Sequence, residues 1–256
     1  MQVLTLPAKR GLTWLIEGFA IFRRKPALLS FLVLGYWLSM AVVSAIPYLG
    51  QMVSFILIPV FSVSLMNACR LIDTDDELPP QILFSGFHRN LQTLLALGVV
   101  YVTASLIILG LSALFDGGLL FRMLVLGAMP DRDALADTSV FISAQLAICL
   151  LIPVMMAFWF APVLAAWHDM TAGKSLFFSL IACARNWRPF LMYSLAVGII
   201  GVFVPRMANA LLGGEGVGQI LPSLITVAIS LILLPTLYAS FYISYRDIFV
   251  SLRDEA

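Results

Sequence analysis

Two adjacent residues, His168 and Asp169, are of types that could move a proton. Histidine changes its charge near neutral pH, and a neighbouring carboxylate could exchange the proton with it. Successive residues of a helix point in different directions, however, so adjacency alone does not make a direct pair. We therefore favour a simpler interpretation, in which His168 and Asp169 anchor a helix end at the lipid headgroups together with Trp167.

Other catalytic or metal-binding patterns do not stand out. Ser-His-Asp sets and clusters of metal ligands are missing, and the second histidine, His88, lies in a different loop from His168. Cys69, Cys149 and Cys183 each lie in or beside an apolar run, which is typical of small buried side chains rather than of a zinc site or a disulfide framework. We therefore expect no catalytic residue, no cofactor and no metal, and a protein that is not an enzyme.

Charged residues beside apolar runs form the other class of candidates. Arg246 and Asp247 follow a long apolar run, where they could pair with other charged junctions or form a docking patch. Basic side chains at such positions suit the phosphates of lipids. The candidate functional or lipid-facing residues are Arg23, Arg24, Lys25, His168, Asp169, Lys174, Arg185, Arg188, Arg246 and Asp247.

The composition indicates which solvent surrounds these candidates. The chain has 256 residues, of which 61% are hydrophobic and 11% charged, and its mean hydropathy is +1.01. A soluble domain carries about 25% charged residues, and a water-soluble fold could not cover so much apolar surface. A formal net charge of +1 argues against a nucleic-acid partner. Lipid is therefore the predicted solvent, and membrane lipids are the predicted partners, with a membrane protein or a second copy as further ones.

A membrane-spanning helix needs about 20 mostly apolar residues. Backbone groups in the bilayer must be satisfied within a helix or a closed barrel, and barrel strands alternate apolar and polar residues, which Leu146–Ile152 does not. We predict a single all-α membrane domain over 1–256, a polytopic helical bundle with six spans. The predicted spans are Pro26–Ile46, Leu49–Cys69, Leu91–Phe115, Val140–Ala166, Pro189–Ala210 and Ile220–Tyr245.

The placement of Lys and Arg predicts the orientation. One alternate set of connections holds all of these residues except Arg122, Arg132 and Arg206. The positive-inside rule assigns the basic set to the cytoplasm. An even number of spans then places both termini in the cytoplasm.

Three shorter segments have apolar residues at helical spacing with basic residues nearby, which is typical of helices that lie in the headgroup plane. They are Leu12–Phe22, Gln81–Phe87 and Leu176–Trp187, all on the predicted cytoplasmic side. The apolar face of the first comprises Leu12, Leu15, Ile16, Phe19 and Phe22. Its one acidic residue, Glu17, is expected to be satisfied by a nearby basic side chain or by solvent.

Each of these segments precedes a pair of spans, which suggests three copies of one unit over 8–70, 80–169 and 172–247. Pro59 and Pro235 are each followed eleven residues later by an arginine, whereas the middle unit carries Pro153 and Pro162. A proline inside a helix frees a carbonyl and bends the helix. We interpret these four prolines as candidate kinks, which either line a cavity or fit the helices together.

Several short motifs carry a resemblance to a known family. They are Pro7–Trp14, Ala172–Ser179, Cys183–Arg188 and Tyr245–Asp247. Through them the chain resembles an uncharacterised family of bacterial inner-membrane proteins of about 250 residues with six predicted spans. A looser likeness is to the membrane region of some glycerophosphodiester phosphodiesterases, without their catalytic domain. The resemblance implies a location and a topology, and it supplies no functional residue.

Two functions remain open, with an embedded enzyme as a weaker third. The first is a non-enzymatic membrane or envelope factor that organises lipid or a protein partner, and a dry bundle with a cytoplasmic patch would favour it. The second is a transporter or channel for a weakly polar or lipid-like substrate, which a water-filled cavity lined by Asn67, Gln145 or Asn209 would favour. His168, Asp169 and Asp247 around one pocket would indicate an enzyme.

Overall fold

The computed structural model describes residues 2–47, 49–127, 138–212 and 220–250. Six helical segments in these ranges are long and apolar enough to cross a bilayer, which confirms the six predicted spans. They are α2 (Pro26–Ser44), α3 (Gly50–Asp73), α4 (Leu91–Asp116), α7 (Thr138–Trp159) continued by α8 (Ala161–Trp167), α10 (Trp187–Gly198) continued through η2 (Ile199–Phe203) to α11 (Val204–Leu212), and α12 (Ile220–Ile248). A short helix, α5 (Leu119–Leu126), follows α4.

Local chemistry explains several helix ends. Pro26 begins α2, where its missing N–H would have no partner within the helix anyway. The helices α3 and α12 both continue beyond their predicted ends at Cys69 and Tyr245. Their extra turns carry Asp73, Arg246 and Asp247, whose charges find partners outside the span.

Two of the six spans are not the continuous α-helices that the hydrophobic runs predicted. The fourth is broken at Phe160, where Ser179 is inserted: its hydroxyl donates to the Met156 carbonyl at 2.8 Å and accepts the Phe160 N–H at 2.9 Å. These are the two groups that an uninterrupted helix would join directly. Pro162 follows in the first turn of α8. The fifth span contains the wide π-helical turn η2 directly after Gly198.

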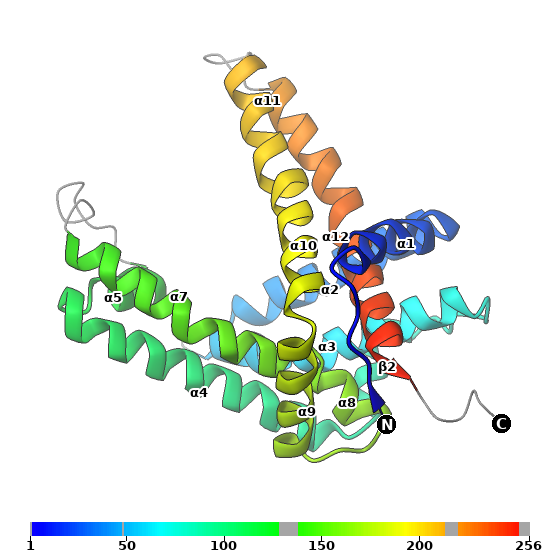
Figure 1. Cartoon of the computed structure of the whole chain (residues 1–256), viewed down its shortest axis with the longest axis horizontal. Coiled ribbons are helices and arrows are strands. Elements are labelled where there is room, and N and C mark those ends of the chain that lie inside the picture. Colours follow the sequence, from blue (N-terminus) through cyan, green and yellow to red (C-terminus); the bar gives the residue numbers. More distant parts are fainter. Residues whose placement is uncertain (1, 48, 128–137, 213–219, 251–256) are drawn as a thin grey trace.

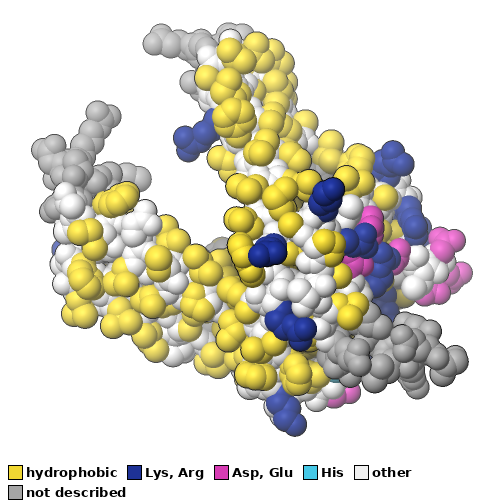
Figure 2. Space-filling view, viewed as in Figure 1, with side chains coloured by type: hydrophobic (Ala, Val, Ile, Leu, Met, Phe, Trp, Pro, Cys, Tyr) yellow, Lys and Arg dark blue, Asp and Glu magenta, His cyan; other side chains and the backbone are white. Residues whose placement is uncertain are grey.

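The three spanning hairpins diverge from a common base (Figure 1). In this view the α4–α7 hairpin extends to the left, the hairpin of α10, α11 and α12 extends upward, and the fainter α2–α3 hairpin lies behind them. The two strands, β1 (Gln2–Val3) and β2 (Phe249–Val250), lie at the base. Hydrophobic side chains cover the two visible arms, whereas most Lys and Arg side chains in view gather around the base (Figure 2).

The helices confirm the predicted all-α membrane bundle, and the base adds one small two-stranded sheet. The strand β1 (Gln2–Val3) pairs antiparallel with β2 (Phe249–Val250), with Val3 opposite Phe249. Asn186, which is fully buried, accepts the Leu6 N–H and donates to the Leu4 carbonyl, both at 2.9 Å. The backbone groups of the N-terminal segment are thus satisfied by the last helix and by the α9–α10 junction.

The three predicted interfacial segments form helices of the base. They are α1 (Arg10–Arg24), the 3₁₀ helix η1 (Ile82–His88) and α9 (Ala172–Arg185). Each packs against the second span of another hairpin: α1 on α12, η1 on α3, and α9 on α7 and α8. These contacts link the three hairpins in a closed cyclic order. Together, α1, η1, α8, α9 and the two strands form what we call the basal layer.

The first interfacial helix has a buried face that the hydrophobic pattern did not predict. Gly11, Trp14, Gly18 and Ile21 are buried against α10 and α12, whereas Ile16 of the predicted apolar face is 67% exposed. A Cβ on Gly18 would lie 2.6 Å from the backbone nitrogen of Ser240 in α12. The glycine therefore permits a close backbone approach between α1 and α12.

Candidate functional site

A cavity of about 600 Å³ lies where the three hairpins meet. Side chains of α2, α3, α4, α7, α8, α10 and α12 line it, so every hairpin contributes to its wall. Its volume falls within the range that is usual for small-molecule sites. Its aromatic side chains are Tyr36, Phe55, Tyr101, Phe158, Trp159, Tyr193, Tyr238 and Phe241.

The cavity wall is apolar and uncharged. None of its lining residues is Asp, Glu, Lys, Arg or His, and its polar side chains besides Trp159 are the tyrosines together with Ser62 and Ser194. The hydroxyls of Tyr193 and Ser240 bond to each other at 2.7 Å. The wall therefore suits hydrocarbon and aromatic groups, with hydroxyls able to meet a weakly polar one.

Two of the four candidate kink prolines, Pro59 and Pro162, line this cavity. Pro235 lines a second hollow of about 290 Å³ between α2 and α12, and Pro153 lies inside α7 and lines neither space. Leu234 belongs to both hollows, so the second one adjoins the central cavity. The bends themselves remain predictions, apart from the break at Phe160 just before Pro162.

The three amide side chains that would indicate a water-filled cavity do not line it. Asn67 instead lies close to the basal layer, where it donates to the Ser85 hydroxyl at 2.9 Å and accepts the Trp167 N–H at 2.8 Å. Gln145 and Asn209 are also absent from both hollows. Asn67 thus holds elements together, as polar groups inside membrane proteins often do.

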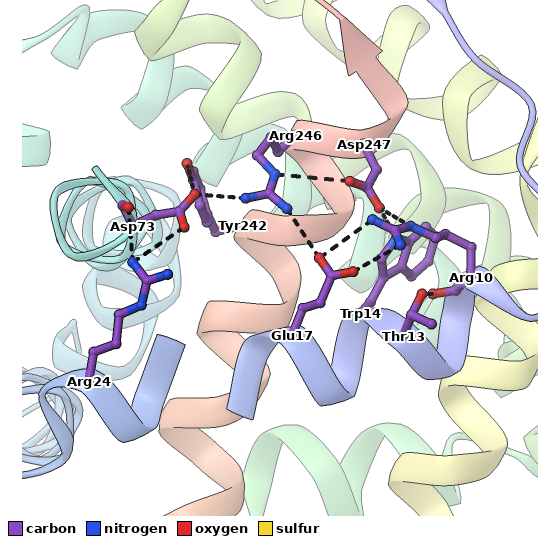
Figure 3. A network of polar contacts seen from close by, with 9 residues as sticks. All are labelled: Arg10, Thr13, Trp14, Glu17, Arg24, Asp73, Tyr242, Arg246 and Asp247. Carbon is purple, nitrogen blue, oxygen red and sulfur yellow. Dashed lines mark hydrogen bonds and ion pairs between the residues drawn. The ribbon is translucent and has the colours of Figure 1, made fainter. Parts of the chain in front are cut away.

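A network of ion pairs joins α1 of the basal layer to two of the spans that line the cavity (Figure 3). Arg10 of α1 contacts Asp247 at 2.5 Å and Glu17 at 2.9 Å. Arg246 contacts Glu17 at 3.1 Å and Asp73 of α3 at 2.8 Å. The network therefore joins α1, α3 and α12, and it satisfies Glu17 with basic side chains as predicted.

Aromatic and backbone groups complete this network. The fully buried Trp14 donates its indole N–H to Asp247 at 2.9 Å, and the Tyr242 hydroxyl donates to Asp73 at 3.0 Å. Arg24 donates to the carbonyls of Ile72 and Asp73 at the end of α3. The hydrogen bond and charge of Asp247 raise the pKa of Arg10, despite the opposing effect of burial.

In the described part of the chain, His168 and Asp169 form no hydrogen bond or ion pair with each other, as their adjacency on the chain suggested. The Nε2 atom of His168 lies 2.6 Å from the Tyr245 hydroxyl, and Asp169 has a left-handed backbone with φ of 49°. Burial, assisted by neighbouring positive charge including that of Arg70, lowers the pKa of His168. Neither of the two hollows includes His168, Asp169 or Asp247, so the arrangement expected of an enzyme is not formed there.

The other basic candidates lie around the basal layer with different partners. The guanidinium of Arg23 lies over the Phe19 ring and that of Arg188 over the Trp187 ring, at 5.8 and 5.5 Å from the centroids. Arg185 donates to the Thr5 hydroxyl. In the described part of the chain, Lys25 and Lys174 take part in no ion pair. Their charges are available to groups outside the chain.

The aromatic residues of the cavity wall were not predicted as site residues from the sequence, because each lies in a run that is hydrophobic all round. Tyrosine enrichment was the available signal: Tyr36, Tyr101, Tyr193 and Tyr238 lie inside four different predicted spans. A phenol in a span needs a polar partner or a cavity, and that requirement could have separated these residues from ordinary lipid-facing ones.

Comparison with known proteins finds one closely similar relative. A probable inner membrane protein of Burkholderia thailandensis is 36% identical to this chain over 255 residues. The alignment covers 97% of this chain and 94% of the relative. No family model and no solved structure matches the chain.

Proposed function

The chain belongs to the same family of bacterial inner-membrane proteins as this Burkholderia protein, and we propose that it is a non-enzymatic membrane factor that binds lipid. Its lipid site is the central cavity, which takes hydrocarbon between the three hairpins. The observation that carries the proposal is the wall: all three hairpins contribute apolar and aromatic side chains to one space of about 600 Å³.

Physical chemistry limits the occupants of this space. Helices that span a bilayer are surrounded by hydrocarbon, and an apolar hollow between them offers water few hydrogen bonds. An empty hollow of this size would forfeit dispersion contacts along its walls. Hydrocarbon of a membrane lipid restores these contacts without a desolvation cost for charge.

The basal layer supports an orientation in which both termini lie in the cytoplasm. Most Lys and Arg side chains in view in Figure 2 lie at this end, in agreement with the positive-inside rule. Lys25 and Lys174 are then placed to contact anionic headgroups. Cysteines introduced one at a time at Lys174 and Leu49, in a chain that lacks the exposed Cys149 and keeps the buried Cys69 and Cys183, should label from opposite sides of the membrane. Burial raises the pKa of Cys183 to about 12, so this native thiol should stay unlabelled.

Filling the cavity tests lipid binding directly. Gly198 lines it, and a Cβ there would meet no atom within 4 Å, so Gly198→Phe should occupy the space without a clash. Gly110 of α4 has equally open surroundings outside the cavity, which makes Gly110→Phe a matched control. Native mass spectrometry and lipid extraction of the purified proteins should show a lipid that Gly198→Phe loses and Gly110→Phe retains.

Two results would contradict the proposal. One is an unchanged lipid content in the Gly198→Phe protein. The other is a change in its oligomeric mass without a change in lipid, which would identify a second copy of the chain as the occupant.

Transport of a weakly polar or lipid-like substrate is the second candidate. It is favoured by the position of Pro59 and Pro162 in the cavity wall, since prolines leave unpaired carbonyls and permit bending. Proteoliposomes distinguish the two functions. A transporter would speed the exchange of a fluorescent lipid-like substrate between leaflets, whereas a lipid-binding factor would retain lipid without speeding its exchange.

A further inference from the structure

We propose that the central cavity selects an uncharged lipid, one whose polar part is a carbonyl or hydroxyl rather than a phosphate. This inference rests on the proposed lipid-binding function and names the class of lipid. It follows from how charge is distributed over the fold.

The cavity provides no counter-charge for an ionic headgroup. Its wall contains no ionisable side chain other than tyrosine, and the charges of the network at the base, from Arg10, Glu17, Asp73, Arg246 and Asp247, are engaged with one another. An isolated charge in such surroundings carries a large desolvation penalty. A phosphate would therefore remain at the headgroup level, outside the cavity.

The depth of the cavity leads to the same conclusion. Tyr238 of α12 lines it and precedes Arg246 of the charge network by eight residues, which corresponds to about 12 Å of helix. The hydrocarbon layer is about 30 Å thick. This part of the wall thus lies well inside the layer, where a neutral polar group is tolerated far better than a charged one.

The polar atoms of the wall match a neutral acceptor. Among the described residues, the hydroxyls of Tyr101, Ser62 and Ser194 have no hydrogen bond within the protein. The indole nitrogen of Trp159, in the same wall, is buried without a partner in the described ranges. Hydroxyl donors beside aromatic faces suit a carbonyl carried on a flat or unsaturated group.

Matched ligands test the selectivity. The full-length protein in nanodiscs of a synthetic zwitterionic lipid is offered a short-chain diacylglycerol, the phosphatidic acid with the same chains, and a decyl-substituted benzoquinone. For each probe, binding in the cavity is the difference in bound probe between the wild-type protein and Gly198→Phe. This difference excludes phosphatidic acid that basic residues of the basal layer hold at the surface. We expect the neutral probes to bind at least tenfold more tightly than phosphatidic acid, and the diacylglycerol and quinone arms identify which neutral class is preferred.

A hydroxyl deletion tests the recognition. Tyr101→Phe removes the phenol oxygen and keeps the ring, which packs on Phe158 with centroids 5.3 Å apart. It should weaken binding of the preferred neutral probe about two- to fivefold, as the loss of one neutral hydrogen bond does. Thr103→Val, which removes an exposed hydroxyl from the same helix outside the cavity, should leave it unchanged.

The outcomes separate the two proposals. If Gly198→Phe removes no lipid at all, the proposal that the cavity binds lipid is wrong. If Gly198→Phe removes phosphatidic acid as readily as the neutral probes, the cavity binds lipid but does not select for the absence of charge, and the present inference is overturned. Equal binding by wild type and Tyr101→Phe would overturn the role of the wall hydroxyls.

Discussion

Replacing Asp247 with alanine should destabilise the protein by more than the loss of an exposed ion pair would. The carboxylate is 11% exposed, and it accepts hydrogen bonds from Arg10 at 2.5 Å and from the Trp14 indole at 2.9 Å. Both partners belong to α1, whereas Asp247 belongs to α12. The substitution therefore removes two polar contacts between α1 and α12, made by residues 233 and 237 apart along the chain, and leaves the contact between Glu17 and Arg246 in place.

The expected magnitude follows from the exposure of each group. Exposed ion pairs contribute about 0–1 kcal/mol, whereas breaking a fully buried pair costs about 3–5 kcal/mol. Because Arg10 is 31% exposed, we place the ion pair between these limits, at about 1.5 kcal/mol. The stranded N–H of the fully buried Trp14 adds about 1 kcal/mol. Asp247→Ala should thus lower the free energy of unfolding by about 2.5 kcal/mol.

The assay is unfolding in mixed micelles titrated with a denaturing detergent, followed by tryptophan fluorescence. Arg10→Met and the double variant complete a cycle, whose coupling energy should be about 1–1.5 kcal/mol. Asp76→Ala is the control, since its contact with Thr74 is exposed and the loss should stay below about 0.5 kcal/mol. A coupling energy below about 0.5 kcal/mol would refute the view that this network holds α1 on α12.

Three further substitutions follow from the packing and are measured in the same unfolding assay. Gly18→Ala should destabilise by about 1–3 kcal/mol because its Cβ meets the backbone of α12, whereas Gly110→Ala, which meets nothing, should be neutral or slightly stabilising. Ser179→Ala should cost about 1–3 kcal/mol, since the Phe160 N–H loses its acceptor; a neutral result would contradict the inserted hydroxyl as the cause of the helix break. Because the pKa of folded His168 lies below its ordinary value of 6.5, the folded state binds fewer protons there, so stability should fall as the pH drops below about 6.5. His168→Gln should flatten that dependence, and an unchanged pH profile would show that other groups cause it.

The six spans could be predicted because they follow from solvation alone. A run such as Leu91–Phe115 has only one stable state in hydrocarbon, whatever the rest of the chain does. The charge pairing at Glu17 was likewise predictable, since an acidic residue on a basic helix has few other choices. The paired partners were not, because Arg246 lies 229 residues from Glu17 along the chain.

Features that depend on contacts between distant segments could not be predicted. The break at Phe160 is caused by Ser179 on the next helix, and nothing in the hydrophobic run around Phe160 shows it. The buried face of α1 was missed because Gly11 and Gly18 register as weakly hydrophobic, although they permit the closest helix contacts. The predicted kink prolines were informative only in part, since their neighbours decide whether they face a cavity.

The cavity could not be predicted because it arises from the angles between hairpins, and those angles are set at one end. Cyclic packing of α1, η1 and α9 and the charge network fasten the hairpins at the base, whereas the visible arms diverge above it (Figure 1). In water, apolar arms held in this way would close on one another to bury their surface. In a bilayer that drive is absent, because lipid tails are as apolar as the arms. Divergent arms are therefore stable while hydrocarbon fills the space between them, and under the proposed function the lipid in the cavity supplies part of that hydrocarbon.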